Sequence, residues 1–126
     1  MAIVLWVALG GAIGAAARHG VNVWSGRFFG TDFPWHTLSV NLLGCFIMGL
    51  LTGLLALRLS LPQEARAFLA TGILGGFTTF SAFALDFAML VERKAIVAAG
   101  AYAAGSVLLS LAAVFSGLWL MRALLQ

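Results

Sequence analysis

Four long apolar runs constrain the fold of this chain more than any other feature of its sequence. Each is close to the ~20 residues that a helix rising ~1.5 Å per residue needs to cross a ~30 Å hydrocarbon layer. None alternates polar and apolar residues as the strands of a membrane barrel do. We therefore predict an all-α membrane protein, a single domain over residues 1–126, with spans at about 2–22, 37–57, 68–90 and 96–121.

Composition supports a membrane protein in contact with lipid. Of 126 residues, 63% are hydrophobic and 9% are charged, and a soluble domain this short cannot bury so much apolar surface in one core. The seven basic residues form no stripe, so nucleic acid is not an expected partner. The single cysteine, Cys45, excludes an internal disulfide, and its apolar neighbours favour a small structural residue.

Basic residues are almost evenly divided between the two sides of the membrane. If the four spans alternate in direction, one side carries Arg58, Arg66 and Arg122, and the other carries Arg18, Arg27, Arg93 and Lys94. Three basic residues against four give the positive-inside rule little to act on. Insertion in both orientations, and hence an antiparallel dimer, is one reading of this balance. A weak bias toward one orientation is the other.

Polar residues inside the spans indicate a lined pathway, because each needs a partner or water there. Asn41 lies about one turn inside the second span. In the fourth span Tyr102, Ser106 and Ser110 recur every four residues, which places their hydroxyls on one helix face. Small residues at the same spacing indicate tight helix packing; these are Gly10 and Gly14, Gly49 and Gly53, and Ala101 and Gly105.

The stretch GGFTTFSAF, residues 75–83, predicts a break in the third span. Two adjacent glycines weaken a helix by roughly 1 kcal/mol each relative to alanine, and the hydroxyls of threonine and serine can satisfy the backbone groups that a break frees. A broken membrane helix offers carbonyls to a small cation and a helix N-terminus to an anion. Inward-turned edges of the phenylalanine rings are a weakly positive contact for an anion.

This stretch, with TLSVN at 37–41, GAAAR at 14–18 and the fourth-span hydroxyls, resembles the Fluc family of small fluoride channels. The resemblance covers all four spans. It implies a fluoride-selective channel that exports fluoride from the cytoplasm, multi-pass in the bacterial plasma (inner) membrane. It also implies an antiparallel, dual-topology homodimer with two pores.

The resemblance further implies the roles of particular residues. A structural sodium ion at the dimer centre would be held by backbone carbonyls matching Gly75 and Thr78. The fluoride pathway would pass two phenylalanines, an asparagine and four hydroxyl groups; the matching residues are Phe80, Phe83, Asn41, Ser81, Tyr102, Ser106 and Ser110.

Three residues depart from the family pattern: Ala82 replaces a threonine, Asp86 a glutamate and His36 a glycine. Ala82 removes one candidate hydroxyl donor, and His36 is expected at the membrane interface. Arg18 and Asp86 lie at matched depth in spans one and three, where a pair would lower the cost of both charges. In the alternative, Arg18 extends to the interface and Asp86 bonds hydroxyls or water.

Two other functions compete with a channel. A small multidrug-type exporter also has four short spans, but proton-coupled export of cations favours a membrane-embedded carboxylate, and Asp86 lies toward a span end. A non-transporting assembly subunit explains the glycines but not the hydroxyl stripe and the break. An enzyme is not expected, because the sequence shows no nucleophile–base pair, metal-ligand motif or phosphate loop.

Overall fold

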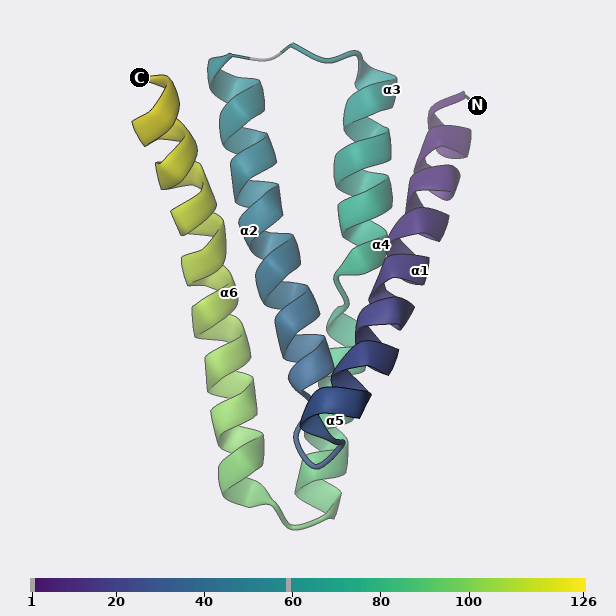
Figure 1. Ribbon diagram of the computed structural model, residues 1–126, viewed down its shortest axis with the longest axis vertical. Coiled ribbons are helices and arrows are strands. Elements are labelled where there is room, and N and C mark those ends of the chain that lie inside the picture. The colour runs from purple at the N-terminus through teal and green to yellow at the C-terminus, as the bar shows by residue number, and fades with distance from the viewer. Residues whose placement is uncertain (1, 59) are drawn as a thin grey trace.

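The computed structural model describes residues 2–58 and 60–126, and these residues form helices and short connections without a strand. Within them, four helical segments are long and apolar enough to cross a membrane: Ala2–Phe29, Trp35–Leu57, Gln63–Glu92 and Ile96–Leu125. All four predicted spans are confirmed. Residues 1 and 59 of the expected 1–126 domain lie outside the described residues. The N-terminus, the α2–α3 connection and the C-terminus lie at one end (Figure 1).

The first helix, α1 (Ala2–Phe29), is longer than expected. The first span was predicted to end at about residue 22, but the helix continues through Arg27, which lies in its last turn. A cation there is favoured by the negative end of the helix dipole. The helix ends where Gly30 takes a φ of +74°, a left-handed conformation that glycine adopts without steric cost. The connection to α2 (Trp35–Leu57) is therefore short.

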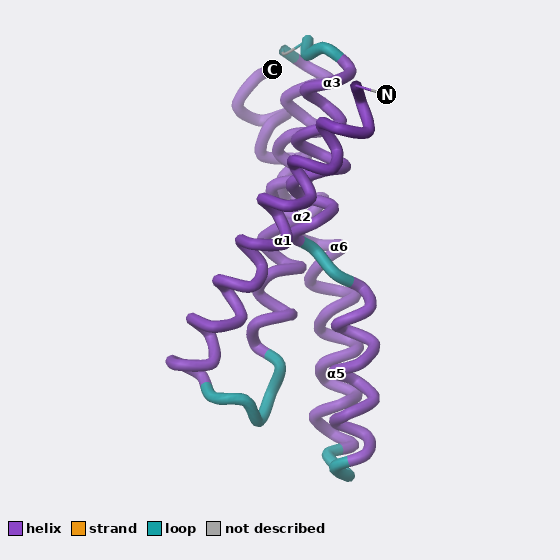
Figure 2. The backbone as a smooth tube through the Cα atoms, turned by 90° about the vertical axis from the view of Figure 1, so that its right-hand side faces the viewer, coloured by secondary structure: helices purple, strands orange, loops and turns teal. Residues whose placement is uncertain are grey.

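The third segment is broken, as predicted. It consists of α3 (Gln63–Arg66), a π-helical stretch η1 (Ala67–Leu74), α4 (Gly75–Phe77) and α5 (Phe80–Glu92). Thr78 and Thr79 are extended, with ψ of 156° and 125°, and they form the short connection between α4 and α5 in Figure 2. The break lies within the predicted stretch 75–83. Gly75 and Gly76 are themselves helical, and the backbone changes direction after them.

The glycines of the first and third segments allow two helices to approach closely. A β-carbon on Gly72 would lie 2.9 Å from the Cα of Gly10, and one on Gly76 would lie 2.7 Å from the carbonyl oxygen of Gly11. Real side chains do not fit at such distances. Gly76 is therefore a packing residue, which explains a glycine at this position better than a weakened helix does.

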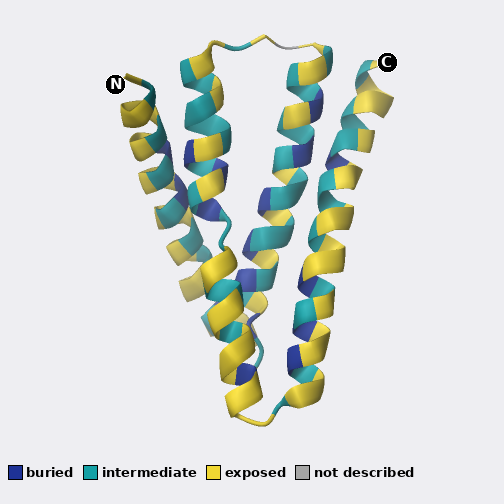
Figure 3. Ribbon diagram, turned by 180° about the vertical axis from the view of Figure 1, so that it is seen from behind, coloured by how far each residue is buried: buried dark blue, intermediate teal, exposed yellow. Residues whose placement is uncertain are grey.

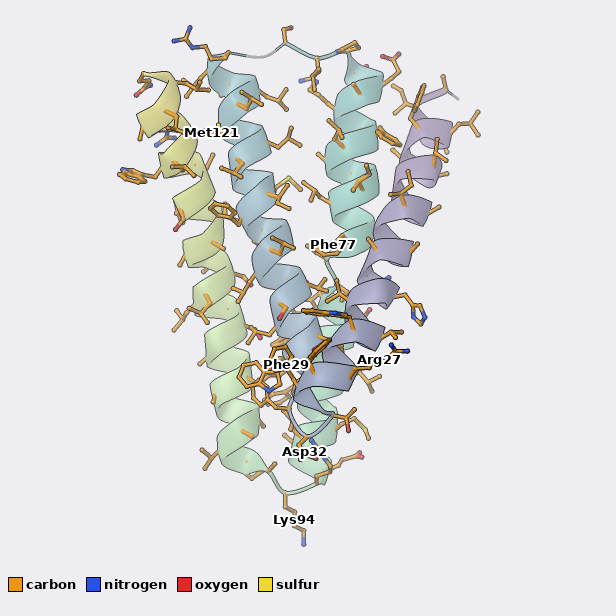
Figure 4. All side chains as sticks on the ribbon, in the orientation of Figure 1. Arg27, Phe29, Asp32, Phe77, Lys94 and Met121 are labelled. Atoms are coloured by element: carbon orange, nitrogen blue, oxygen red, sulfur yellow. The ribbon has the colours of Figure 1, made fainter. Side chains whose placement is uncertain are left out.

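A second close pair is formed by α2 and α6 (Ile96–Leu125). A β-carbon on Gly49 would lie 3.1 Å from the Cα of Gly117, and one on Gly53 would lie 2.7 Å from the Cβ of Met121; Met121 is labelled on α6 in Figure 4. The spacings Gly10/Gly14 and Gly49/Gly53 thus serve packing. Gly105 has no atom within 4 Å of its β-carbon position, so Ala101/Gly105 does not pack inside this subunit.

Buried residues follow the inner faces of the helices, and the outer faces are exposed (Figure 3). A small core of Leu90, Ala99 and Tyr102 joins α5 to α6. Large apolar side chains such as Val97 and Trp119 are exposed on α6. In a chain that spans a membrane, such surfaces contact lipid or another protein.

Candidate functional site: a cavity beside the helix break

The break in the third segment is held by the side chain of Asn41 on α2. Its Nδ2 donates to the carbonyl oxygen of Thr79 at 3.0 Å, and its Oδ1 accepts from the Thr79 amide at 2.8 Å. Both backbone groups of the extended residue are therefore satisfied without water. This pairing matters in a membrane, where an unpaired peptide group costs several kcal/mol.

The two threonines complete the break locally. The Thr78 hydroxyl donates to the carbonyl oxygen of Leu74 at 3.0 Å, which supports the last turn before the break. Thr79 is the N-cap of α5, because its Oγ1 accepts from the Ala82 amide at 3.1 Å. A threonine N-cap satisfies one of the free amides at a helix start, so each hydroxyl in the TT pair has a distinct structural partner.

These hydrogen bonds divert two amides from the carbonyls that they would bond in a continuous helix. The carbonyl of Gly75 would accept from Thr79, four residues on, but the Thr79 amide donates to Asn41. The carbonyl of Thr78 would accept from Ala82, but that amide donates to Thr79 Oγ1. Gly75 is also exposed on the subunit surface. Gly75 and Thr78, whose carbonyls lose their usual amide partners, are the two residues predicted to hold a cation.

A cavity of about 330 Å³ opens beside the break, between α2, α5 and α6. It brings together five of the seven residues predicted for the fluoride pathway. The full lining is Asn41, Cys45, Thr78, Thr79, Phe80, Phe83, Ser106, Val107, Ser110, Leu111 and Val114. Five of these eleven side chains carry a hydroxyl or an amide group, but most of the wall surface is apolar.

Ser106 is the most unusual of the polar lining residues. Its side chain is 6% exposed, and among the described residues its Oγ is the one buried side-chain polar atom without a hydrogen-bond partner. A buried hydroxyl without a partner costs about 1–3 kcal/mol, so the Ser106 hydroxyl is free to bond a ligand that enters the cavity. Ser110, one turn further along α6, continues the polar face of this wall.

Ser81 and Tyr102 are outside the cavity lining. Ser81 is exposed at the start of α5, and its Oγ lies 3.3 Å from Thr79 Oγ1. Tyr102 is 1% exposed and donates its hydroxyl hydrogen to Asp86 Oδ2 at 3.1 Å. The expected stripe on α6 therefore exists as one face, but its tyrosine bonds a carboxylate instead of lining the cavity.

Asp86 joins three helices through hydroxyl groups. Besides the bond from Tyr102 on α6, Asp86 Oδ2 accepts from Thr37 Oγ1 on α2 at 2.6 Å. Thr37 is 2% exposed, and sequence reasoning gave it no role. Of the two readings of Asp86, the structure shows the hydroxyl bonding, and among the described residues Arg18 is not one of its hydrogen-bond partners.

The missed residue had a signal in the sequence. Thr37 and Asn41 are four residues apart, the same spacing that singled out the hydroxyls of α6. Residues at this spacing share a helix face. Cys45 follows Asn41 after four more residues and lies on the cavity wall. It was expected to be a small structural residue, and the structure shows in addition that it is one of the residues lining the cavity.

A row of aromatic rings extends from the cavity lining at Phe80 and Phe83 to Tyr102 and Phe33. The centroids of Phe80 and Phe83 are 5.5 Å apart, and those of Phe83 and Tyr102 are 5.2 Å apart. Phe33 meets Tyr102 edge to face at 5.5 Å. Phe83 is half-buried, whereas Phe80 is 78% exposed. The first ring of the row therefore extends beyond the surface of the single subunit.

A second, smaller cavity of about 200 Å³ lies at the end of the molecule opposite the termini. His36, Asp86 and Arg93 line it. Arg93 also donates to the carbonyl oxygen of Asp32 at 2.7 Å, in the α1–α2 connection, and Lys94 extends away from the helices at this end (Figure 4). His36 is half-buried here, at a helix start, as expected for an interfacial residue.

Residues 5–118 match the family model described as CrcB-like protein, Camphor Resistance (CrcB). Among similar proteins, a fluoride-specific ion channel FluC from Rhizobium etli (strain CIAT 652) is 56% identical over 118 residues, 94% of each chain. One from Chelativorans sp. (strain BNC1) is 55% identical, covering 97% of this chain and 98% of its own. One from Rhodopseudomonas palustris (strain BisB5) is 52% identical, covering 95% and 97%.

Proposed function

This chain belongs to the CrcB-like protein family, and we propose that it is a fluoride-selective ion channel of the bacterial plasma membrane. The observation that carries the proposal is identity of 52 to 56% with fluoride-specific ion channels over nearly the whole chain. The four membrane-spanning helices provide the multi-pass architecture that such a channel needs. Export of fluoride from the cytoplasm then follows its concentration gradient.

The cavity beside the break is the proposed pathway within one subunit. Fluoride is small and strongly hydrated, so an anion entering an apolar cavity must exchange water for other donors. The Ser106 hydroxyl has no partner among the described residues, and Ser110 lies one turn further on. Asn41 uses Oδ1 and Nδ2 on Thr79, but an amide NH₂ has two hydrogens, so one hydrogen remains for an anion.

The ring edges of Phe80 and Phe83 are proposed to bridge the gaps between these donors. An aromatic ring is negative on its face and positive at its edge, so an edge turned to the cavity attracts fluoride without a hydrogen-bonding group. Ser81 and Tyr102 retain a proposed role at the ends of this path. Tyr102 would act there through Asp86 and Thr37, which it joins in one hydrogen-bonded group.

A structural sodium ion at the helix break is a further proposal. Sodium is coordinated by unwound backbone carbonyls in broken membrane helices, and the carbonyls of Gly75 and Thr78 are the two whose usual amide partners bond Asn41 and Thr79. The donor set therefore fits a small hard cation. Because Gly75 is exposed, a second copy of the chain could supply the remaining oxygen ligands.

We further propose an antiparallel homodimer with two pores. The balance of basic residues on the two sides supports insertion in both orientations. Phe80, 78% exposed, leaves one wall of the pathway incomplete in a single subunit, and a partner would cover it. Two copies related by a two-fold axis in the membrane plane would then form two equivalent pathways.

A small multidrug-type exporter is not favoured. Such an exporter needs a membrane carboxylate that is free to exchange protons and cations, whereas Asp86 already accepts hydrogen bonds from two hydroxyl groups. A non-transporting assembly subunit has no need of the buried, unpartnered hydroxyl of Ser106.

The proposed function is tested with purified protein in liposomes loaded with fluoride, with efflux measured by a fluoride electrode. We expect rapid fluoride efflux, and little efflux from liposomes loaded with chloride. Equal rates for the two anions would contradict fluoride selectivity.

A further inference from the structure

The polar stripe of α6 faces a second stripe on α2. Thr37, Asn41 and Cys45 recur every four residues along α2 and therefore share one helix face. Thr37 on α2 and Tyr102 on α6 both donate a hydrogen bond to the Asp86 carboxylate. Asn41 and Cys45 line the cavity together with Ser106 and Ser110. Cys45 is thus the second polar residue on the α2 side of this cavity, after Asn41.

The thiol is placed where a reagent in the cavity can reach it. Cys45 is half-buried and free, and it is the only cysteine of the chain. It shares the cavity with the buried, unpartnered hydroxyl of Ser106, an independent sign that a ligand occupies this space. Further along α6 the lining becomes apolar at Leu111 and Val114, so Cys45 and Ser110 lie where the polar lining ends.

We infer that Cys45 is a modification site on the wall of the fluoride pathway, and that a small thiol-directed electrophile attached there blocks conduction. The inference rests on the proposed function. A thiol is a weak donor to an anion. After modification, Cys45 carries a larger group that has no S–H donor. Because the other walls of the cavity are mostly apolar, fluoride then has neither the space nor the donor that it had before.

Methyl methanethiosulfonate transfers a methylthio group to the Cys45 sulfur. The Cys45 thiol first loses its proton to water, because the thiolate is the nucleophile. The thiolate attacks the methylthio sulfur of the reagent, a protein–SCH₃ disulfide bond forms, and the sulfur–sulfonyl bond breaks with release of methanesulfinate. No external oxidant is needed, since the reagent itself supplies the oxidised sulfur.

The test treats the protein in liposomes with this neutral reagent and compares fluoride efflux before and after. We expect one added methylthio group per chain by mass spectrometry and a fall in fluoride efflux of about tenfold or more. Fluoride in the bath, compared with chloride at equal concentration, should slow the modification, because fluoride and the reagent compete for the same space. Dithiothreitol should restore the original flux.

Two variants control for reaction elsewhere, each compared with its own untreated flux. Cys45→Ala should lose all sensitivity to the reagent; Cys45→Ser replaces it if the alanine variant conducts too slowly to measure. Cys45→Ala with Val97→Cys moves the thiol to a residue that is 87% exposed on α6, where modification should leave efflux unchanged.

Three results would overturn the inference: no methylthio adduct, an adduct with unchanged efflux, or lost efflux together with loss of the native elution volume in size-exclusion chromatography. The last would attribute the effect to unfolding. The untreated flux tests the proposed function, whereas the change on treatment tests the thiol site, so the two can fail separately.

Discussion

Asn41 and Thr79 form a two-point contact across the helix break, in which one amide side chain satisfies both the N–H and the C=O of one extended residue. Asn41 is therefore a structural clamp as well as a proposed donor on the fluoride pathway. The two roles predict different consequences for substitutions at this position.

Asn41→Asp should abolish fluoride efflux and also destabilise the protein. A carboxylate has no N–H to give the Thr79 carbonyl and repels an anion in the cavity. We expect a loss of about 1–3 kcal/mol in stability, measured as a lower Tm in detergent, with efflux reduced at least about tenfold. A variant with wild-type Tm and wild-type efflux would show that the clamp contributes to neither.

Phe80→Ile and Phe83→Ile should each lower fluoride efflux by at least about tenfold. Isoleucine keeps the apolar bulk but lacks the positive ring edge. Methionine, which is flexible and polarizable, should be tolerated better, so Phe→Met at each position is the matched control. If the isoleucine variants are expressed normally and conduct fluoride at wild-type rates, the rings serve packing only and their edges play no part in conduction.

Gly75→Val and Gly76→Val distinguish packing inside the subunit, which involves Gly76, from the proposed dimer and sodium contacts, which involve Gly75. A β-carbon on Gly76 would clash with the backbone of Gly11, whereas one on Gly75 has only the Ala70 oxygen at 3.6 Å. We expect Gly76→Val to lose roughly 1–3 kcal/mol in stability. Gly75→Val should keep the helical content of the subunit but weaken dimers and the sodium dependence of their stability.

The readouts for this pair are circular dichroism and the oligomeric state in detergent with and without sodium. Dimers of Gly75→Val that are as stable as wild type would argue against both a partner and a cation at this carbonyl.

Thr37→Val should destabilise the packing of α5 on α2. The substitution removes the 2.6 Å hydrogen bond to Asp86 while keeping the shape of the side chain, and a half-buried carboxylate that loses a donor costs about 1 kcal/mol or more. We expect a lower Tm and reduced efflux. Thr37→Ser, which restores the hydroxyl, should recover the Tm, and failure to do so would assign the effect to the methyl group instead.

A tag at the C-terminus should be reachable from both sides of the membrane in one population, because the basic residues are balanced. Tag accessibility in intact and opened cells measures this distribution. Adding two lysines at residues 60–62 should bias insertion and reduce efflux until an oppositely biased copy is co-expressed. Protection of every tag from one side would exclude antiparallel dimers.

Hydropathy predicted the four spans because length and apolar content are local properties, but it ended the first helix too early. Residues 23–29 include Arg27 and are less apolar than the preceding run, but they contain no proline, and the helix continues through Ser25 and Gly26 to Phe29. The break was predicted from the composition of residues 75–83 and lies within that stretch, but composition did not predict which of its residues are extended. The position of the extended residues depends on Asn41, which is 38 residues away in sequence from Thr79, and on Gly76 meeting α1.

The candidate site was predicted in the same uneven way. Ser106 and Ser110 were found by their spacing, and the same spacing on α2 would have found Thr37 and Cys45. The roles of Phe80, Phe83, Gly75 and Thr78 came from family resemblance. Spacing alone could not supply them, because the ring contacts and the diverted amides depend on how the broken segment meets α2 and α6.

The pairing of α1 with the first half of the third segment, and of α2 with α6, has a consequence for biosynthesis. Gly49 and Gly53 of α2 make their close contacts with Gly117 and Met121, in the last helix to leave the ribosome. While α1 can meet its partner as soon as residues 67–77 have been made, this part of α2 must wait in the bilayer until translation is nearly finished. Chains released before residue 117 would present the glycine face of α2 to lipid, and to quality-control proteases, without its mate.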